Sequence, residues 1–117
     1  MSQTAAMLLT LAVEVPLGLA VAGLGRWPAD RRHWLRLAAV LVAMSLITHP
    51  FAWTLNVDLA PHLSPWARVA VIEVAVAAFE GLLLWRFGRL TPARGFGLGA
   101  VVNAASFGVG LLFFLYG

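Results

Sequence analysis

Four long apolar stretches alternate with three short polar connections along the chain. The apolar stretches cover residues 4–25, 37–57, 69–87 and 95–116. A helix needs about 20 mostly apolar residues to cross about 30 Å of hydrocarbon, and each stretch has about that length. The pattern predicts an all-α polytopic membrane protein with four transmembrane helices in a single domain over residues 1–117, with the lipid bilayer as its surroundings.

The composition agrees with this class. Hydrophobic residues make up 62% of the chain and charged residues 11%, against about a quarter in soluble proteins. There is no cysteine, which excludes disulfides, thiolate metal sites and cysteine nucleophiles. The net charge is +3, but the arginines lie between apolar stretches and not along one polar face, so no nucleic-acid partner is expected.

The arginines predict the orientation of the chain in the membrane. They gather at the first and third connections, whereas the middle connection has none and only Arg68 borders it. Cytoplasmic connections carry an excess of basic residues, so both termini are expected on the outer side of the inner (plasma) membrane. The arginines of the two basic connections are Arg26, Arg31, Arg32, Arg36, Arg86, Arg89 and Arg94.

Three ionisable side chains interrupt the apolar stretches at one depth. Glu14, His49 and Glu73 each lie twelve or thirteen residues from an arginine at the cytoplasmic end of their own span. At 1.5 Å per residue, this places all three roughly 18–20 Å from that edge. An ionisable group near the bilayer centre costs at least about 2.5–3.5 kcal/mol. We therefore expect the three side chains to face one another inside the bundle.

Three further polar residues extend this layer. Ser106 falls at about 18 Å by the same count, while Glu80 and Asn103 form a lower layer at roughly 9 and 13 Å. Each has a structural alternative. Glu80 is within reach of Arg86 and the cytoplasmic interface. Asn103 and Ser106 share a face with small residues such as Gly99, a pattern typical of helix packing in membranes.

Two prolines lie beside these residues, in "VEVPLG" and "LITHPFAW". A proline inside a helix removes one N–H donor and leaves the carbonyl four residues earlier without its helical partner. The freed carbonyls belong to Ala12 and Leu46, close to Glu14 and His49. Such carbonyls are tolerated at membrane depth where a neighbouring helix, water or an ion satisfies them.

Buried carboxylates without a buried arginine indicate a site that holds a proton or a cation. A histidine with carboxylates suits zinc, manganese or iron, and carboxylates with carbonyls suit a harder ion. The sequence thus predicts cation-binding membrane transport, with a divalent metal ion as a possible cofactor on Glu14, His49 and Glu73. The candidate binding residues are Glu14, His49, Glu73, Glu80, Asn103 and Ser106.

Two other functions remain open at this point. One is an intramembrane enzyme that acts on a lipidic substrate, with His49 and one glutamate as an acid–base pair. The other is a non-catalytic partner that joins a larger membrane complex through the glycine-rich fourth span. Transport by so short a chain implies a homo-oligomer. No "HExxH", Walker A, "GxSxG" or dinucleotide motif is present.

The two halves of the sequence look related. The segment "VEVPLGLAVAGLGRW" aligns with "IEVAVAAFEGLLLWR", which puts Glu14 over Glu73 and, further along, His49 over Ala105. This predicts a parallel repeat of two helical hairpins, an arrangement that places binding sites where the repeats meet.

In size, number of spans and a glutamate in its first helix, the chain resembles the small multidrug resistance exporters, in which such a glutamate binds protons and cationic substrate in turn. The resemblance covers only "VEVPLG" around Glu14. The third span, "VIEVAVAAFEGLLLW", carries acids that the family's third helix lacks, and "THPFAW" has no counterpart there. The resemblance is one of architecture and does not imply drug export.

Overall fold

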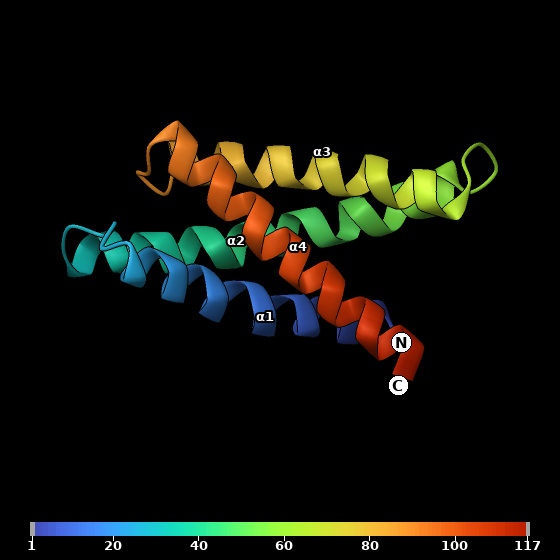
Figure 1. Cartoon of the computed structure of the whole chain (residues 1–117), viewed down its shortest axis with the longest axis horizontal. Helices are drawn as coiled ribbons and strands as arrows, with labels where there is room; N and C mark the ends of the chain where they lie inside the picture. The colour runs from blue at the N-terminus through green and yellow to red at the C-terminus, as the bar shows by residue number, and fades with distance from the viewer. Residues whose placement is uncertain (1, 117) are drawn as a thin grey trace.

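Four helices make up the computed structural model, which describes residues 2–116 and the side chains of residues 2–112. Within the described residues there is no strand, so the all-α prediction is confirmed. The helices, shown in Figure 1, are α1 Gln3–Leu24, α2 Arg31–Leu59, α3 Pro65–Arg86 and α4 Pro92–Tyr116.

Polar caps decide where the helices begin, which is why α2 and α3 start before their apolar stretches. The Asp30 side chain accepts a hydrogen bond from the backbone N–H of His33 at 2.8 Å and starts α2 inside the polar connection. Ser64 caps α3 in the same way, with Pro65 as its first residue. Both α1 and α2 continue through their internal prolines.

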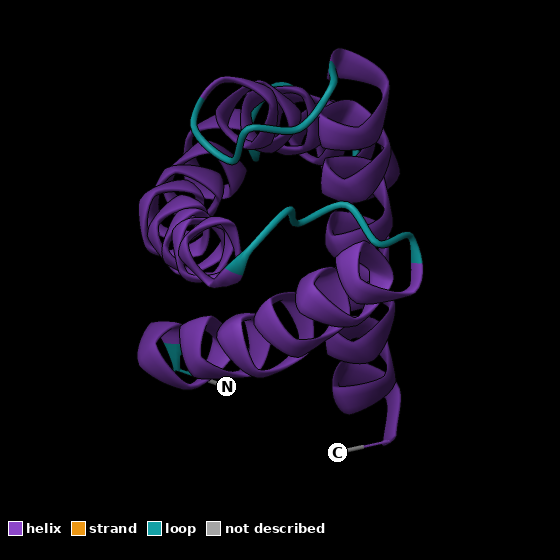
Figure 2. Cartoon of the chain, turned by 90° about the vertical axis from the view of Figure 1, so that its left-hand side faces the viewer, coloured by secondary structure: helices purple, strands orange, loops and turns teal. Residues whose placement is uncertain are grey.

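The connections α1–α2 and α3–α4 lie together at one end of the molecule, called the basic end here because it carries the seven arginines named above (Figure 1). The α2–α3 connection and both termini lie at the other end. Figure 2 shows the two loops of the basic end side by side. The His33 ring joins them: its Nδ1 accepts from the backbone N–H of Ala29, so its Nε2 donates to the carbonyl oxygen of Gly88 at 2.8 Å.

Each helix packs against two neighbours: α1 and α3 both contact α2 and α4. A buried apolar cluster toward the basic end holds them together. Helix α4 runs at an oblique angle to α3 and α1 and crosses both (Figure 1). The cluster consists of Ala22, Leu37, Leu41, Met44, Leu84, Leu90, Leu98 and Val102.

The crossing of α3 and α4 depends on glycine. A Cβ atom on Gly99 would lie 2.8 Å from the backbone nitrogen of Gly81 and 3.2 Å from the carbonyl oxygen of Ala77. The small-residue face of the fourth span therefore packs on α3 of the same chain at Gly99, while a Cβ on Gly110 would meet nothing within 4 Å.

Gly99→Val is expected to destabilise the bundle by about 1–3 kcal/mol, because the added atoms meet backbone that cannot move aside. Gly97→Val is the matched control, since it makes the same change in the same helix and a Cβ there meets nothing within 4 Å. Unfolding in mixed detergent measures both variants. Equal stabilities would show that α3 and α4 do not approach through Gly99.

Three of the four helices, α1, α2 and α4, are long and apolar enough to cross a membrane. Helix α3 is not among them, because Glu73 and Glu80 lie in its apolar stretch between Arg68 and Arg86. These three helices are consistent with a multi-pass membrane protein, and a fourth span depends on where the two glutamates of α3 point.

Candidate functional site

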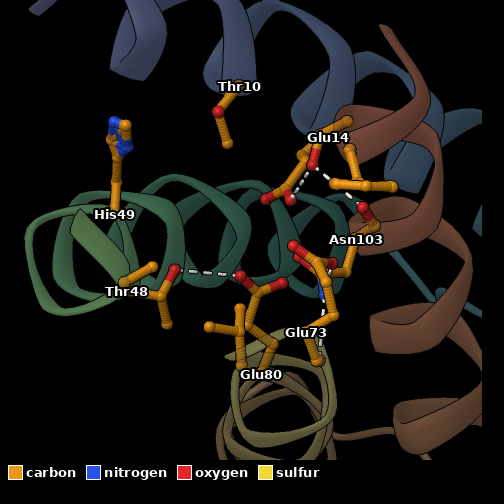
Figure 3. A pocket seen from close by; sticks show the side chains of 11 residues that line it. Thr10, Glu14, Thr48, His49, Glu73, Glu80 and Asn103 are labelled. Atoms are coloured by element: carbon orange, nitrogen blue, oxygen red, sulfur yellow. Dashed lines mark hydrogen bonds between the residues drawn. The ribbon is translucent and has the colours of Figure 1, made fainter. Parts of the chain in front are cut away.

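A polar cavity of about 150 Å³ lies between the four helices (Figure 3). Each helix contributes to its lining, and three of the lining side chains are carboxylates, Glu14, Glu73 and Glu80. The cavity is large enough to hold several water molecules or a small ion with part of its hydration shell. The other lining residues are Thr10, Thr48, His49, Ala52, Val76, Asn103, Ser106 and Phe107.

Glu14 of α1 is 1% exposed, and both of its carboxylate oxygens have partners. The Ser45 hydroxyl of α2 donates to Oε2 at 2.7 Å, and the Ser106 hydroxyl of α4 donates to Oε1 at 2.9 Å. Two neighbouring helices therefore hold this one carboxylate, and no charged donor takes part.

Each serine also has a second acceptor within reach. The Oγ of Ser45 lies 3.0 Å from the carbonyl oxygen of Leu41, and the Oγ of Ser106 lies 3.1 Å from that of Asn103. A hydroxyl has one hydrogen to donate and can accept as well. When Glu14 is ionised, both hydroxyls donate to it. When Glu14 carries a proton, one hydroxyl turns to its backbone carbonyl and accepts from the carboxyl group, so the site satisfies Glu14 in either protonation state.

Glu73 of α3 is half-buried and bound to α4. The Asn103 side-chain amide donates to Glu73 Oε2 at 2.7 Å and to the Glu73 backbone carbonyl at 3.2 Å. The sequence placed these two residues in different layers. Counting residues from an arginine gives equal depth only for helices that run parallel, and α4 crosses its neighbours obliquely (Figure 1). Asn103 thus reaches Glu73.

Glu80 is 1% exposed and lies in the cavity wall, not at the basic end. The Thr48 hydroxyl of α2 donates to its Oε1 at 2.9 Å, while its Oε2 is buried without a hydrogen-bond partner. The alternative that Glu80 reaches the interface or pairs with Arg86 is therefore wrong. Its position seven residues after Glu73 brings it back to the inner face of α3.

The three carboxylates influence one another electrostatically. Glu14 is close enough to both Glu73 and Glu80 for like charges to repel, and Glu73 and Glu80 repel each other as well. Among the side chains of residues 2–112, their partners are neutral hydroxyl and amide groups only. Three negative charges in one small cavity are costly without a proton or cation to balance them.

His49 lines the same cavity but does not join the carboxylates. Its ring packs edge-on against Trp53, with centroids 6.1 Å apart, and its Nε2 is buried without a hydrogen-bond partner. Figure 3 shows the ring on α2 well apart from the glutamates. In the part of the chain that the structure describes, no three His, Asp or Glu side chains are grouped so as to hold a metal ion. The metal site on Glu14, His49 and Glu73 stays a prediction without structural support.

Sequence reasoning missed the hydroxyl donors Ser45 and Thr48. Their signal was present, because Leu37, Leu41 and Ser45 follow one another at spacings of four, with Thr48 three residues later. This spacing keeps all of them on one helix face, and all are buried. The signal for these donors was a buried apolar stripe on α2 whose residues become polar at the depth of Glu14.

The predicted repeat stays a prediction. In the alignment of the two halves, Ser45 falls opposite Val101 and Asn103 falls opposite Ile47. The two glutamates that align, Glu14 and Glu73, thus take their hydrogen bonds from positions that do not correspond.

No protein-family model, curated protein or solved structure matches the chain. The function is therefore inferred from the chemistry of the cavity.

Proposed function

We propose that this membrane protein binds protons at its buried carboxylates and exchanges them for a cation, as part of transport across the bilayer by a homo-oligomer. The observation that carries the proposal is the hydrogen bonding of Glu14, because Ser45 and Ser106 can satisfy it with or without its proton. Such a group gains and loses a proton without any helix having to move.

The exchange follows from charge balance. Facing the cavity are Glu14 from α1, His49 from α2, and Glu73 and Glu80 from α3, while α4 contributes only neutral groups. The cavity is neutral while its carboxyl groups hold their protons. A cation that enters the cavity displaces these protons. Cation binding therefore releases protons, so the apparent affinity for the cation rises as the pH rises.

The proposal is tested by adding a cation to the detergent-solubilised protein in weak buffer and following the pH with an indicator dye. Proton release that saturates with cation concentration is the expected result. The same titrations at several pH values should show tighter binding at higher pH. A pH-independent affinity with no proton release contradicts the proposal.

We further propose that α3 is the fourth span. Glu80 is buried and Glu73 is half-buried against Asn103, so the glutamates that reduce its hydropathy do not face lipid. Arg68 and Arg86 bracket the apolar part of the helix, as expected for residues at the two membrane interfaces. The basic end then lies in the cytoplasm and both termini on the outer side of the inner membrane.

Single cysteines test this topology, since the chain has none of its own. A cysteine at Ser64 or Ser2 is expected to react with a membrane-impermeant maleimide added from outside. A cysteine at Ala29 or Ala93, near the basic end, is expected to react only after the membrane is permeabilised. Labelling in the reverse order would invert the orientation, and labelling of Ala93 from the same side as Ser64 would remove α3 from the membrane, because α3 lies between these two residues.

The two other functions have less support. The enzyme needs His49 and a glutamate as an acid–base pair, and His49 Nε2 has no hydrogen-bond partner. The assembly partner needs a free small-residue face on α4, and Gly99 of that face packs on α3 of the same chain.

A further inference from the structure

A second, apolar hollow lies on the outer surface between α2 and α3. It has a volume of about 490 Å³ and is lined by Ile47, Thr48, Phe51, Ala75 and Phe79. Ile47, Phe51 and Phe79 are exposed by 54%, 56% and 41%, so the hollow opens sideways, toward the surroundings of the bundle. In a membrane this groove faces the hydrocarbon of the lipids.

The apolar groove and the polar cavity meet at one residue. Thr48 lines both of them. Its hydroxyl donates to Glu80 Oε1, and Glu80 follows Phe79, which forms the opposite wall of the groove. A molecule that lies in the groove therefore has its inner end against Thr48, and the carboxylate of Glu80 lies directly behind the Thr48 hydroxyl that donates to it.

Glu80 determines what that inner end must be. Glu80 as a whole is 1% exposed, and its Oε2 is buried without a hydrogen-bond donor. A buried acceptor without a donor is costly. A partner that supplies both an N–H donor and a positive charge answers both needs. A primary ammonium group has three such donors, whereas a quaternary ammonium has none.

We propose that the protein binds primary alkylammonium ions, with the ammonium group on Glu80 in the cavity and the alkyl chain in the groove between α2 and α3. The proposal rests on the proposed function, because it names the cation that the buried carboxylates exchange for protons. The ligand arrives as a cation, the Glu80 carboxyl group releases its proton to water, and one proton leaves for each ligand bound.

Four probes separate the parts of this site on the full chain in detergent: n-hexylammonium, n-hexyltrimethylammonium, methylammonium and sodium. Calorimetry against micelle blanks gives the affinities, and an indicator dye gives the protons released. Hexylammonium is expected to bind about tenfold or more tightly than methylammonium, which has no chain for the groove. It is also expected to bind about tenfold or more tightly than hexyltrimethylammonium, which has the same charge and chain but no N–H donor.

Variants assign the contacts. Glu80→Gln is expected to remove hexylammonium binding and its proton release. Phe79→Ala is expected to weaken hexylammonium several-fold and leave methylammonium and sodium unchanged. Phe87→Ala is the matched control, because Phe87 is also exposed and lies directly after α3 but is not part of the groove. It is expected to bind every probe as the parent does.

The outcomes are distinguishable. Equal affinities for hexylammonium and methylammonium would mean that lipid or detergent alone fills the groove, and equal affinities for the two hexyl compounds would mean that Oε2 takes no donor. Either result overturns the alkylammonium site. If sodium still releases protons when the alkylammonium site is overturned, the proposed function is not contradicted. If no probe releases protons, the alkylammonium site and the proposed function are both wrong.

Discussion

Glu14→Gln is expected to weaken cation binding, together with the proton release that accompanies it, while the bundle still folds. Glutamine keeps the shape of the side chain and resembles the protonated carboxyl group. Its oxygen accepts from one serine, and its amide donates to the other, whose hydroxyl turns to a backbone carbonyl. What it cannot do is carry a negative charge, so the cation loses a buried partner worth about 2 kcal/mol or more, a factor of about 30 in affinity.

Asp58→Asn is the matched control for this change. It also removes one carboxylate, but Asp58 is exposed near the end of α2 and does not line the cavity. Glu73→Gln is expected to resemble Glu14→Gln, because Asn103 can hold the amide as it holds the carboxylate. Unchanged proton release from both glutamine variants would exclude Glu14 and Glu73 from the exchange.

Glu80→Met is expected to stabilise the fold by about 1–3 kcal/mol and at the same time to impair cation binding. The wild-type carboxyl group is buried, has one hydrogen bond from Thr48, and leaves Oε2 without a partner. Replacing such a group by an apolar side chain of similar length removes the desolvation cost. Methionine adapts to the space, and the Thr48 hydroxyl can turn to a backbone carbonyl of its own helix.

Glu14→Met provides the comparison, measured by the same unfolding titration. Both oxygens of Glu14 have partners, so we expect its replacement to gain less stability than that of Glu80. The test is which of the two variants is the more stable. If Glu80→Met is the less stable variant, Oε2 has a stabilising partner in solution, and the cost assigned to it is wrong.

The sequence by itself determined the secondary structure and the end at which the charges lie. Apolar stretches of about 20 residues specify membrane-length helices wherever they occur, because the bilayer imposes that length. The arginines lie at one end because they occur in the first and third connections. Consecutive connections between spanning helices lie at opposite ends, so the first and third share one end and the middle connection lies at the other. The sequence also identified the three glutamates that line the cavity as candidate site residues, since a carboxylate in an apolar stretch is costly unless it is turned inward.

Only the tertiary structure decided which of these residues meet. Residue spacing gives the face and, for parallel helices, the depth of a side chain, but the oblique crossing of α4 at Gly99 changed the depth of Asn103 and brought it to Glu73. The rotation of each helix about its own axis is set by packing across the bundle, and it placed Ser45 on Glu14 and left His49 beside Trp53. Contacts between helices depend on crossing angle and rotation together, and neither quantity is encoded in the periodicity of a single helix.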